Sequence, residues 1–278
     1  MDPTQVLATI RKVSPGITVV GESLTDVWYL GTFGEPAQED AKIRRFVTQR
    51  TIEMPGGAAN VRVSLAAIQN KPVHHLTPPL VGKKIRWWDT ERDALVFRHD
   101  MDVMVSTASV NMDHSGTRKL VIADYGKGLF DWHFLLKIAK KFPRAVFSPH
   151  LTTCGISPVK LPPELTKDWI CVVNTSESAM LKQRWAQAWP VGLMVETNGE
   201  FPIRMLADLR PAGYVMPEAV RMPLHVVGIG DCFLAGFAAA HFSGHKASES
   251  IRFAAHICTR VLQARRPGTC CVTQEDLG

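Results

Sequence analysis

The sequence predicts an α/β fold: a three-layer α/β/α sandwich with a mainly parallel central sheet and a small β lid. Short β-branched runs alternate with amphipathic helical stretches along most of the chain, which is typical of a parallel sheet covered on both faces. Two segments break this alternation and indicate antiparallel ribbons outside the sheet. A chain of 278 residues is long enough for one large core. We therefore expect a single domain over 1–278, with lid segments at about 28–54 and 84–100.

Each element of the layers follows from the spacing of apolar residues. Compact β-branched and apolar runs predict strands at 17–20, 120–123, 145–147, 170–173 and 192–195. Apolar residues at helical spacing predict helices at 60–68, 132–141, 176–188, 231–241 and 248–264. The proline-rich stretches 77–79 and 158–163 predict loops between elements rather than linkers between domains.

The two irregular segments are expected to form a lid over the carboxyl edge of the sheet, where such folds bind ligands. The second segment alternates polar residues with Ile85 and Trp87, and then with Leu95 and Phe97. Apolar lid residues offer a surface that could pair across a two-fold axis, so we expect a homodimer through the lid. The residues expected on that surface are Trp28, Leu30, Trp87 and Phe97.

Composition narrows the class of partner. The chain has 32 Lys and Arg against 26 Asp and Glu, a formal charge of +6, which favours anionic ligands. The basic residues are scattered without interleaved aromatic residues, so a phosphorylated small molecule fits better than nucleic acid. No stretch reaches the roughly 18 apolar residues of a membrane span, and the start of the chain lacks the apolar core of a signal peptide. The six cysteines show no C-x-x-C spacing. We expect a cytoplasmic protein with no membrane partner.

The most informative segment is Gly228-Ile229-Gly230-Asp231, which precedes a helix of small residues. Glycines let the backbone approach a ligand, and the N–H groups at a helix start suit a phosphoryl group. Asp231 could there take a proton from an attacking hydroxyl. Alternatively, Asp231 caps the following helix in an ordinary turn. These residues alone leave both interpretations open.

Two further segments carry groups that suit a sugar. Asp26, shortly after a predicted strand, can accept hydrogen bonds from hydroxyls, and Gly56-Gly57 allows backbone N–H groups to approach a ligand. Asn60, at the predicted start of a helix, offers both a donor and an acceptor to vicinal hydroxyls. The alternatives are a loop or capping aspartate, and a tight turn followed by an N-cap asparagine.

Other residues suit phosphate groups and their counter-ion. Asn174 and Glu177 follow a buried strand, and their oxygens suit Mg²⁺ near ATP phosphates, unless they only cap the next helix. Lys127, Arg86 and Arg98 are candidates for holding a phosphate already on the substrate, and exposed surface charge is the alternative. The G-x-x-x-x-G-K-[ST] pattern of P-loop kinases does not occur in the sequence.

Five motifs in order along the chain together resemble the ribokinase-like (PfkB) carbohydrate kinases, over about residues 17–277. They are Gly21-Glu22 with Asp26, Pro55-Gly56-Gly57-Ala58-Ala59-Asn60-Val61, Asn174-x-x-Glu177, Thr197-Asn198-Gly199-Glu200 and Gly228-Ile229-Gly230-Asp231. Two more segments are most similar to those of the heptose-7-phosphate kinases. They are Ala123-Asp124-Tyr125-Gly126-Lys127-Gly128, and Arg98-His99-Asp100 after Lys84-Ile85-Arg86.

The resemblance implies a ribokinase-like fold and ATP- and Mg²⁺-dependent phosphorylation of a hydroxyl on a sugar or sugar phosphate. It implies that Asp231 is the base and that Gly228 and Gly230 stabilise charge on the transferred group. It implies sugar binding by Asp26, Gly56, Gly57 and Asn60. It also implies contact with the nucleotide by Asn174, Glu177, Thr197 and Gly199, with Glu177 binding the metal as well. A diverged partner subunit that binds nucleotide or sugar, or a nucleoside kinase on the same fold, are the alternatives.

The chain departs from the family pattern, and two of the departures affect the expected cation site and the flank of the sheet. The segment His225-Val226-Val227 stands where the family has Asp-Thr, whose oxygens are associated with a monovalent cation, so we do not expect activation by such a cation. Between His75 and Lys84 the chain is shorter than the family, which has a strand, a turn and a helix there. We expect a reduced flank of the sheet at this place.

Overall fold

A computed structural model describes residues 2–40, 42–79, 82–106, 110, 119–150, 166–185 and 191–278. Within these ranges, eight strands form the central sheet. In spatial order they are β12 (Arg210–Val215), β11 (Ile203–Ala207), β10 (Leu193–Thr197), β9 (Ile170–Asn174), β8 (Arg144–Ser148), β7 (Lys119–Ala123), β1 (Ile17–Gly21) and β4 (His74–Leu76). The strands from β10 to β4 pair in parallel, and β11 and β12 are antiparallel additions. The predicted mainly parallel sheet is confirmed.

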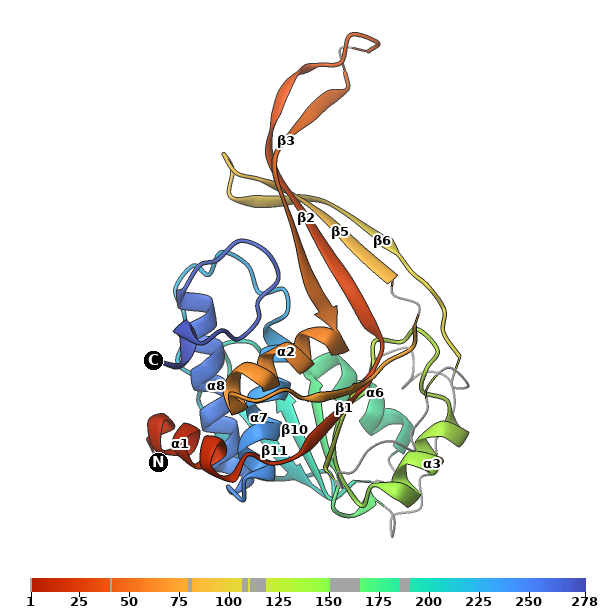
Figure 1. Ribbon diagram of the computed structural model, residues 1–278, viewed down its shortest axis with the longest axis vertical. Helices are drawn as coiled ribbons and strands as arrows, with labels where there is room; N and C mark the ends of the chain where they lie inside the picture. The colour runs from red at the N-terminus through yellow and green to blue at the C-terminus, as the bar shows by residue number, and fades with distance from the viewer. Residues whose placement is uncertain are drawn as a thin grey trace.

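Helices cover both faces of this sheet, as Figure 1 shows. One face packs against α1 (Pro3–Val13), α2 (Ala58–Gln69), α7 (Ile229–Phe242) and α8 (Ala247–Gln263). The other face packs against α3 (Trp132–Lys141) and α6 (Thr175–Trp185). In β7, Val121 points to the first core and Leu120 and Ile122 point to the second, as strand alternation requires. The three-layer prediction is confirmed.

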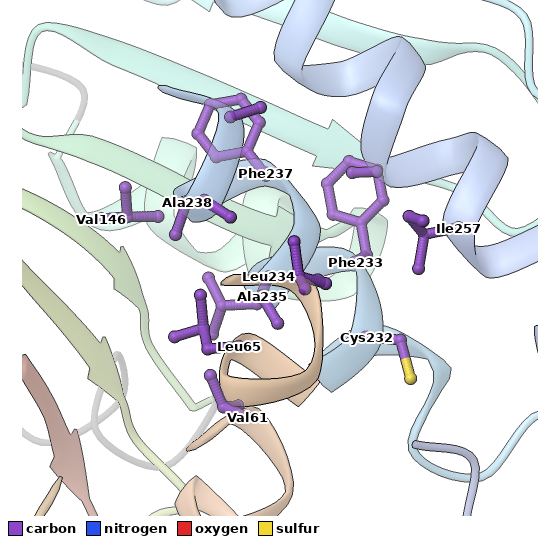
Figure 2. Close-up of a cluster of buried hydrophobic side chains, with 14 of the residues drawn as sticks. Val61, Leu65, Val146, Cys232, Phe233, Leu234, Ala235, Phe237, Ala238 and Ile257 are labelled. Carbon is purple, nitrogen blue, oxygen red and sulfur yellow. The ribbon is translucent and has the colours of Figure 1, made fainter. Parts of the chain in front are cut away.

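Helix α7 lies at the centre of the larger core. Nearly every residue from Cys232 to Phe242 is buried, and such a helix is expected to be apolar on all sides. Figure 2 shows Val61 and Leu65 of α2 and Ile257 of α8 lying around it. A Cβ at Gly236 would lie 3.1 Å from the Cα of Ala254, so glycine permits the close contact with α8. Helix α7 therefore packs closely against α8 at this position.

The lid is a second sheet, formed among the described residues by four strands. In spatial order they are β3 (Arg44–Gly57), β2 (Ser23–Pro36), β5 (Gly82–Asp89) and β6 (Ala94–Met101). The two expected antiparallel ribbons are present, and a parallel pairing of β2 with β5 joins them. Figure 1 shows β2 and β3 as a long ribbon that extends away from the main sheet.

The faces of the lid differ from the prediction at two residues. Trp28 and Leu30 are buried, where they pack with Trp88. Their neighbour Tyr29 lies on the opposite face, because successive strand residues alternate, and its ring contacts that of Trp87. Trp87 contacts Phe97, whose side chain is 58% exposed. This partly exposed aromatic cluster therefore consists of the exposed Phe97 and the half-buried Tyr29 and Trp87, and Trp28 and Leu30 do not belong to it.

Several elements were not predicted. The sequence pattern did not indicate α1, whose N-terminus is capped by the Asp2 side chain, nor strands β4, β11 and β12. Residues 77–79 form a loop as predicted, which follows β4. The predicted loop at 158–163 and the end of the predicted helix 176–188 lie outside the described residues. None of the described helices combines the length and apolarity that crossing a bilayer would require.

Candidate active site

A cavity of about 790 Å³ lies at the carboxyl edge of the central sheet. The last residues of four neighbouring parallel strands line it, namely Ala123, Ser148, Asn174 and Thr197. The first turn of α7 contributes Ile229, Gly230 and Asp231. The volume suits a small-molecule ligand, and α/β sheets bind ligands at this edge.

Two glycines shape the start of α7 for different reasons. Gly228 has φ +86°, and a Cβ there would lie 2.5 Å from the carbonyl oxygen of Cys270 and 2.9 Å from Nδ2 of Asn60. Gly230 is exposed, and no atom lies within 4 Å of a Cβ built on it. Gly228 is therefore required by conformation and packing, whereas Gly230 leaves open space at the helix start. Ile229 packs partly against the core and also lines the cavity.

Asp231 is not a helix cap, because no side chain caps the start of α7. Its Oδ2 accepts a hydrogen bond from Nδ2 of Asn60 at 2.9 Å, and its Oδ1 accepts one from the hydroxyl of Tyr125. Burial raises the pKa of Asp231 from an ordinary 3.8 to about 6, although both hydrogen bonds act to lower it. A carboxyl group with this pKa, partly exposed to the cavity, suits general-base chemistry near neutral pH.

Asn60 is not an N-cap. It is the third residue of α2, is fully buried, and donates from Nδ2 to the carbonyl oxygen of Cys270 at 2.9 Å as well as to Asp231. Its Oδ1 is buried without a hydrogen-bond partner among the described residues. Asn60, which was predicted to bind the sugar, is thus hydrogen-bonded directly to Asp231, the predicted base.

Asp26 lies inside β2 rather than in a loop. Its Oδ1 accepts from Nη1 of Arg86 at 2.7 Å, and both side chains are only 5% exposed. Its Oδ2 accepts from the hydroxyl of Thr269 at 2.7 Å. A Cβ at Gly56 would lie 2.8 Å from Oδ2 of Asp26, so glycine is needed for this contact, and Gly57 joins β3 to α2. The carboxylate therefore already has partners within the protein.

The three predicted phosphate-binding cations each pair with a carboxylate. Besides the pair of Arg86 with Asp26, the Nε of Arg98 donates to Asp100 at 2.7 Å, and Lys127 Nζ lies 2.6 Å from Asp102. Arg86 is buried, so the alternative of exposed surface charge is wrong for that residue. Lys84 was not predicted as a site residue. No carboxylate of the described residues lies within 4 Å of its Nζ, which sits 5.6 Å from the ring centroid of Tyr125.

The predicted nucleotide-binding residues all line the cavity. The backbone N–H of Asn174 donates to Oε2 of Glu177 at 2.8 Å, and that of Glu177 donates to Oδ1 of Asn174 at 2.9 Å. This reciprocal arrangement is a capping box at the start of α6. Asn174 and Glu177 therefore do cap that helix, which was the alternative to a role in metal binding. Burial raises the pKa of Glu177. Thr197 and Gly199 lie at the end of β10 and just beyond it.

Sequence reasoning missed the roles of Glu22 and Tyr125. Glu22 is buried and accepts hydrogen bonds from the backbone N–H groups of Tyr125, Lys127 and Leu129, at 2.9, 3.1 and 3.1 Å. It therefore holds the loop after β7 in place. Both residues belong to recognised motifs, but nothing in their spacing could reveal a hydrogen bond between Tyr125 and Asp231, which are 106 residues apart.

No protein-family model and no curated protein sequence matches this chain. Among solved structures, a ribokinase from Thermotoga maritima aligns with a TM-score of 0.68 at 14% identity, over 95% of this chain and 98% of that one. A nucleoside kinase from Methanocaldococcus jannaschii gives 0.66 at 16% identity, over 94% and 96%. A ribokinase from Arabidopsis thaliana, complexed with ribose and ATP, gives 0.61 at 13% identity, over 95% and 97%. The chain therefore has the ribokinase-like fold.

Proposed function

We propose that the protein is an ATP-dependent kinase that phosphorylates a hydroxyl group of a sugar or sugar phosphate. The observation that carries this proposal is the position of Asp231 at the start of α7, next to the open space at Gly230 and facing the large cavity. The carboxylate can accept the proton of the attacking hydroxyl, and the helix start favours negative charge on the transferred group. The kinases with the same fold support the proposal by analogy.

The cavity fits a nucleotide. Its polar side carries Asn174, Glu177, Thr197 and Gly199, and its volume of about 790 Å³ lies within the usual range for cofactor sites. The described residues contain no group of three or more His, Cys, Asp or Glu side chains that could hold a metal. Glu177 is the proposed ligand of Mg²⁺, which is usually bound by one or two carboxylates together with water and phosphate oxygens. When bound, Mg²⁺ neutralises phosphate charge.

The acceptor is proposed to lie between the lid and α7, near Asp26, Gly56, Gly57 and Asn60. A sugar phosphate such as a heptose 7-phosphate already carries one phosphate group. Lys84 is the cation most available to bind that phosphate, since it has no carboxylate partner among the described residues. Arg98 and Lys127 would have to exchange Asp100 and Asp102 for the phosphate. Such an exchange of charged partners is a source of specificity for phosphorylated acceptors.

A phosphotransfer assay tests the proposal, with ATP and a panel of neutral sugars, sugar phosphates and nucleosides. Asp231→Asn should lower kcat by about 10² to 10⁴-fold, the range expected for loss of a general base. Asp208→Asn is the matched control, because Asp208 is exposed beyond β11. Transfer that Asp231→Asn leaves unchanged would contradict the proposal. ATP binding without turnover would favour a partner subunit, and preferred nucleosides would favour a nucleoside kinase.

A further inference from the structure

We propose that Tyr125 is a positioning residue, which holds the Asp231 carboxylate in the orientation needed to accept a proton. The inference rests on the proposed function, since Asp231 is a base only in that account. Tyr125 lies in the loop after β7 and lines the cavity. None of the roles that the motifs imply includes this residue.

Tyr125 is held at three points. Its backbone N–H donates to Oε2 of the buried Glu22 at 2.9 Å, and its hydroxyl donates to Oδ1 of Asp231. Its ring lies against the Lys84 ammonium group, 5.6 Å from Nζ to the ring centroid. The phenol therefore projects from a fixed loop, and its position does not depend on Asp231 alone.

The carboxylate receives one donor on each oxygen. Asn60 donates to Oδ2, and Asn60 is itself fixed by the carbonyl oxygen of Cys270. Two donors on opposite oxygens fix rotation of the carboxylate about its Cβ–Cγ bond and leave each oxygen further capacity to accept. Without the Tyr125 hydroxyl, only one oxygen is held. Small errors in the position of a reacting group are costly to catalysis.

The titratable groups that interact electrostatically with Asp231 come from several elements. They are Tyr125, Asp26 on β2, Lys84 on β5, Cys232 on α7 and Cys270 near the C-terminus. Burial raises the pKa of both thiols, and burial raises that of Tyr125 well above its ordinary value. The phenol thus stays protonated and remains a donor near neutral pH. Its removal is expected to disfavour the ionised form of Asp231.

Tyr125→Phe tests the inference, with Tyr214→Phe as the matched control because Tyr214 on β12 is 70% exposed. For Tyr125→Phe we expect kcat to fall about tenfold or more while KM for ATP stays within about twofold. In the wild type we expect the acidic limb of the pH profile near the Asp231 pKa of about 6, and in Tyr125→Phe we expect it to move upward by about one pH unit. A folded variant with wild-type kcat and an unchanged acidic limb would overturn the inference.

An NMR titration of Asp231, which does not require catalytic turnover, tests this inference independently of the proposed function. In protein with ¹³C-labelled aspartate, the Asp231 carboxyl signal can be assigned as the one missing in Asp231→Asn and then titrated by NMR. Tyr125→Phe should raise its midpoint, and an unchanged midpoint would overturn the inference. A raised midpoint in a protein without phosphotransfer would support the positioning role and contradict the kinase proposal.

If Tyr125→Phe does not fold, a second variant that keeps a tyrosine ring at position 125 tests the inference. The chain has three tyrosines, so Tyr29→Phe combined with Tyr214→Phe leaves Tyr125 as the only one. Replacement of that tyrosine by 3-fluorotyrosine makes the phenol a stronger hydrogen-bond donor. The Asp231 midpoint should then fall relative to the unfluorinated protein, and a midpoint that does not move would overturn the inference.

Discussion

Asp231 is a carboxyl group in surroundings that oppose its charge, and this has a cost in stability. Its pKa of about 6 in the folded protein lies above the ordinary 3.8, so the folded state binds its proton more tightly than the unfolded state does. The resulting destabilisation develops as the pH rises from about 4 through 6 and is complete above that range. Catalytic sites commonly carry such a cost.

Replacing Asp231 by asparagine should therefore stabilise the protein at neutral pH while removing activity. We expect the free energy of unfolding at pH 7.5 to increase by on the order of 1–2 kcal/mol. At pH 3.5 the gain should be much smaller, because Asp231 is then protonated in both states. Urea unfolding at the two pH values measures this difference. A variant that is less stable than wild type at pH 7.5 would contradict the assigned environment.

At the scale of the element, the two glycines at the start of α7 should respond differently to substitution, because Gly228 is closely packed and Gly230 is not. Gly228→Ala would place a Cβ at positive φ against Asn60 and Cys270, so we expect a clear loss of thermal stability. Gly230→Ala meets no atom within 4 Å and should fold normally, but its methyl group would enter the proposed phosphate site and weaken ATP binding. Thermal melts and calorimetric ATP titrations distinguish the two variants. The opposite pattern would contradict the assignment of the helix start.

The elements that sequence reasoning found are those with a strong internal pattern. Strand β7 is a run of buried apolar residues, and its prediction at 120–123 is one residue short at the start. Strand β12 was missed because it contains Pro211 and Gly213 and is mostly exposed, so it carries no apolar pattern. Strand β4 has only three residues. Helix α1 was not recognised, although Asp2 followed by Pro3 is a typical helix start.

For the site, sequence motifs predicted residue types but not their partners. The motif around Asp231 predicted a base at a helix start, and the structure places this residue in the first turn of α7 next to Gly230. The ion pair of Asp26 with Arg86 could not be foreseen, because it depends on the register of β2 against β5, which pairs Trp28 with Arg86 and Asp26 with Lys84. Register is a property of the folded sheet rather than of local spacing.

At the scale of the whole molecule, the lid carries an aromatic cluster in which Phe97 is exposed and Tyr29 and Trp87 are half-buried. We propose that Tyr29, Trp87 and Phe97 form the contact of a homodimer through the lid, which replaces the predicted surface that included Trp28 and Leu30. Phe97→Glu should convert the dimer to a monomer, because it places charge on that surface. Size-exclusion chromatography with light scattering measures the mass. A wild-type monomer at working concentration would contradict this arrangement.

The net charge of +6 does not by itself describe the site. Arg86, Arg98 and Lys127 are each paired with an aspartate, so their charges are largely compensated where the lid meets the main sheet. Selectivity for an anionic acceptor would come from exchange of these partners and from Lys84, rather than from overall charge.

A crystal structure of the protein with Mg²⁺, a non-hydrolysable ATP analogue and the preferred acceptor decides whether Asp231 faces the group to be transferred. We expect the terminal phosphate at the start of α7 next to Gly230, and an acceptor hydroxyl within hydrogen-bond distance of the Asp231 carboxylate. A nucleotide bound outside the 790 Å³ cavity, or an acceptor whose hydroxyls all point away from Asp231, would contradict the kinase mechanism proposed for this protein.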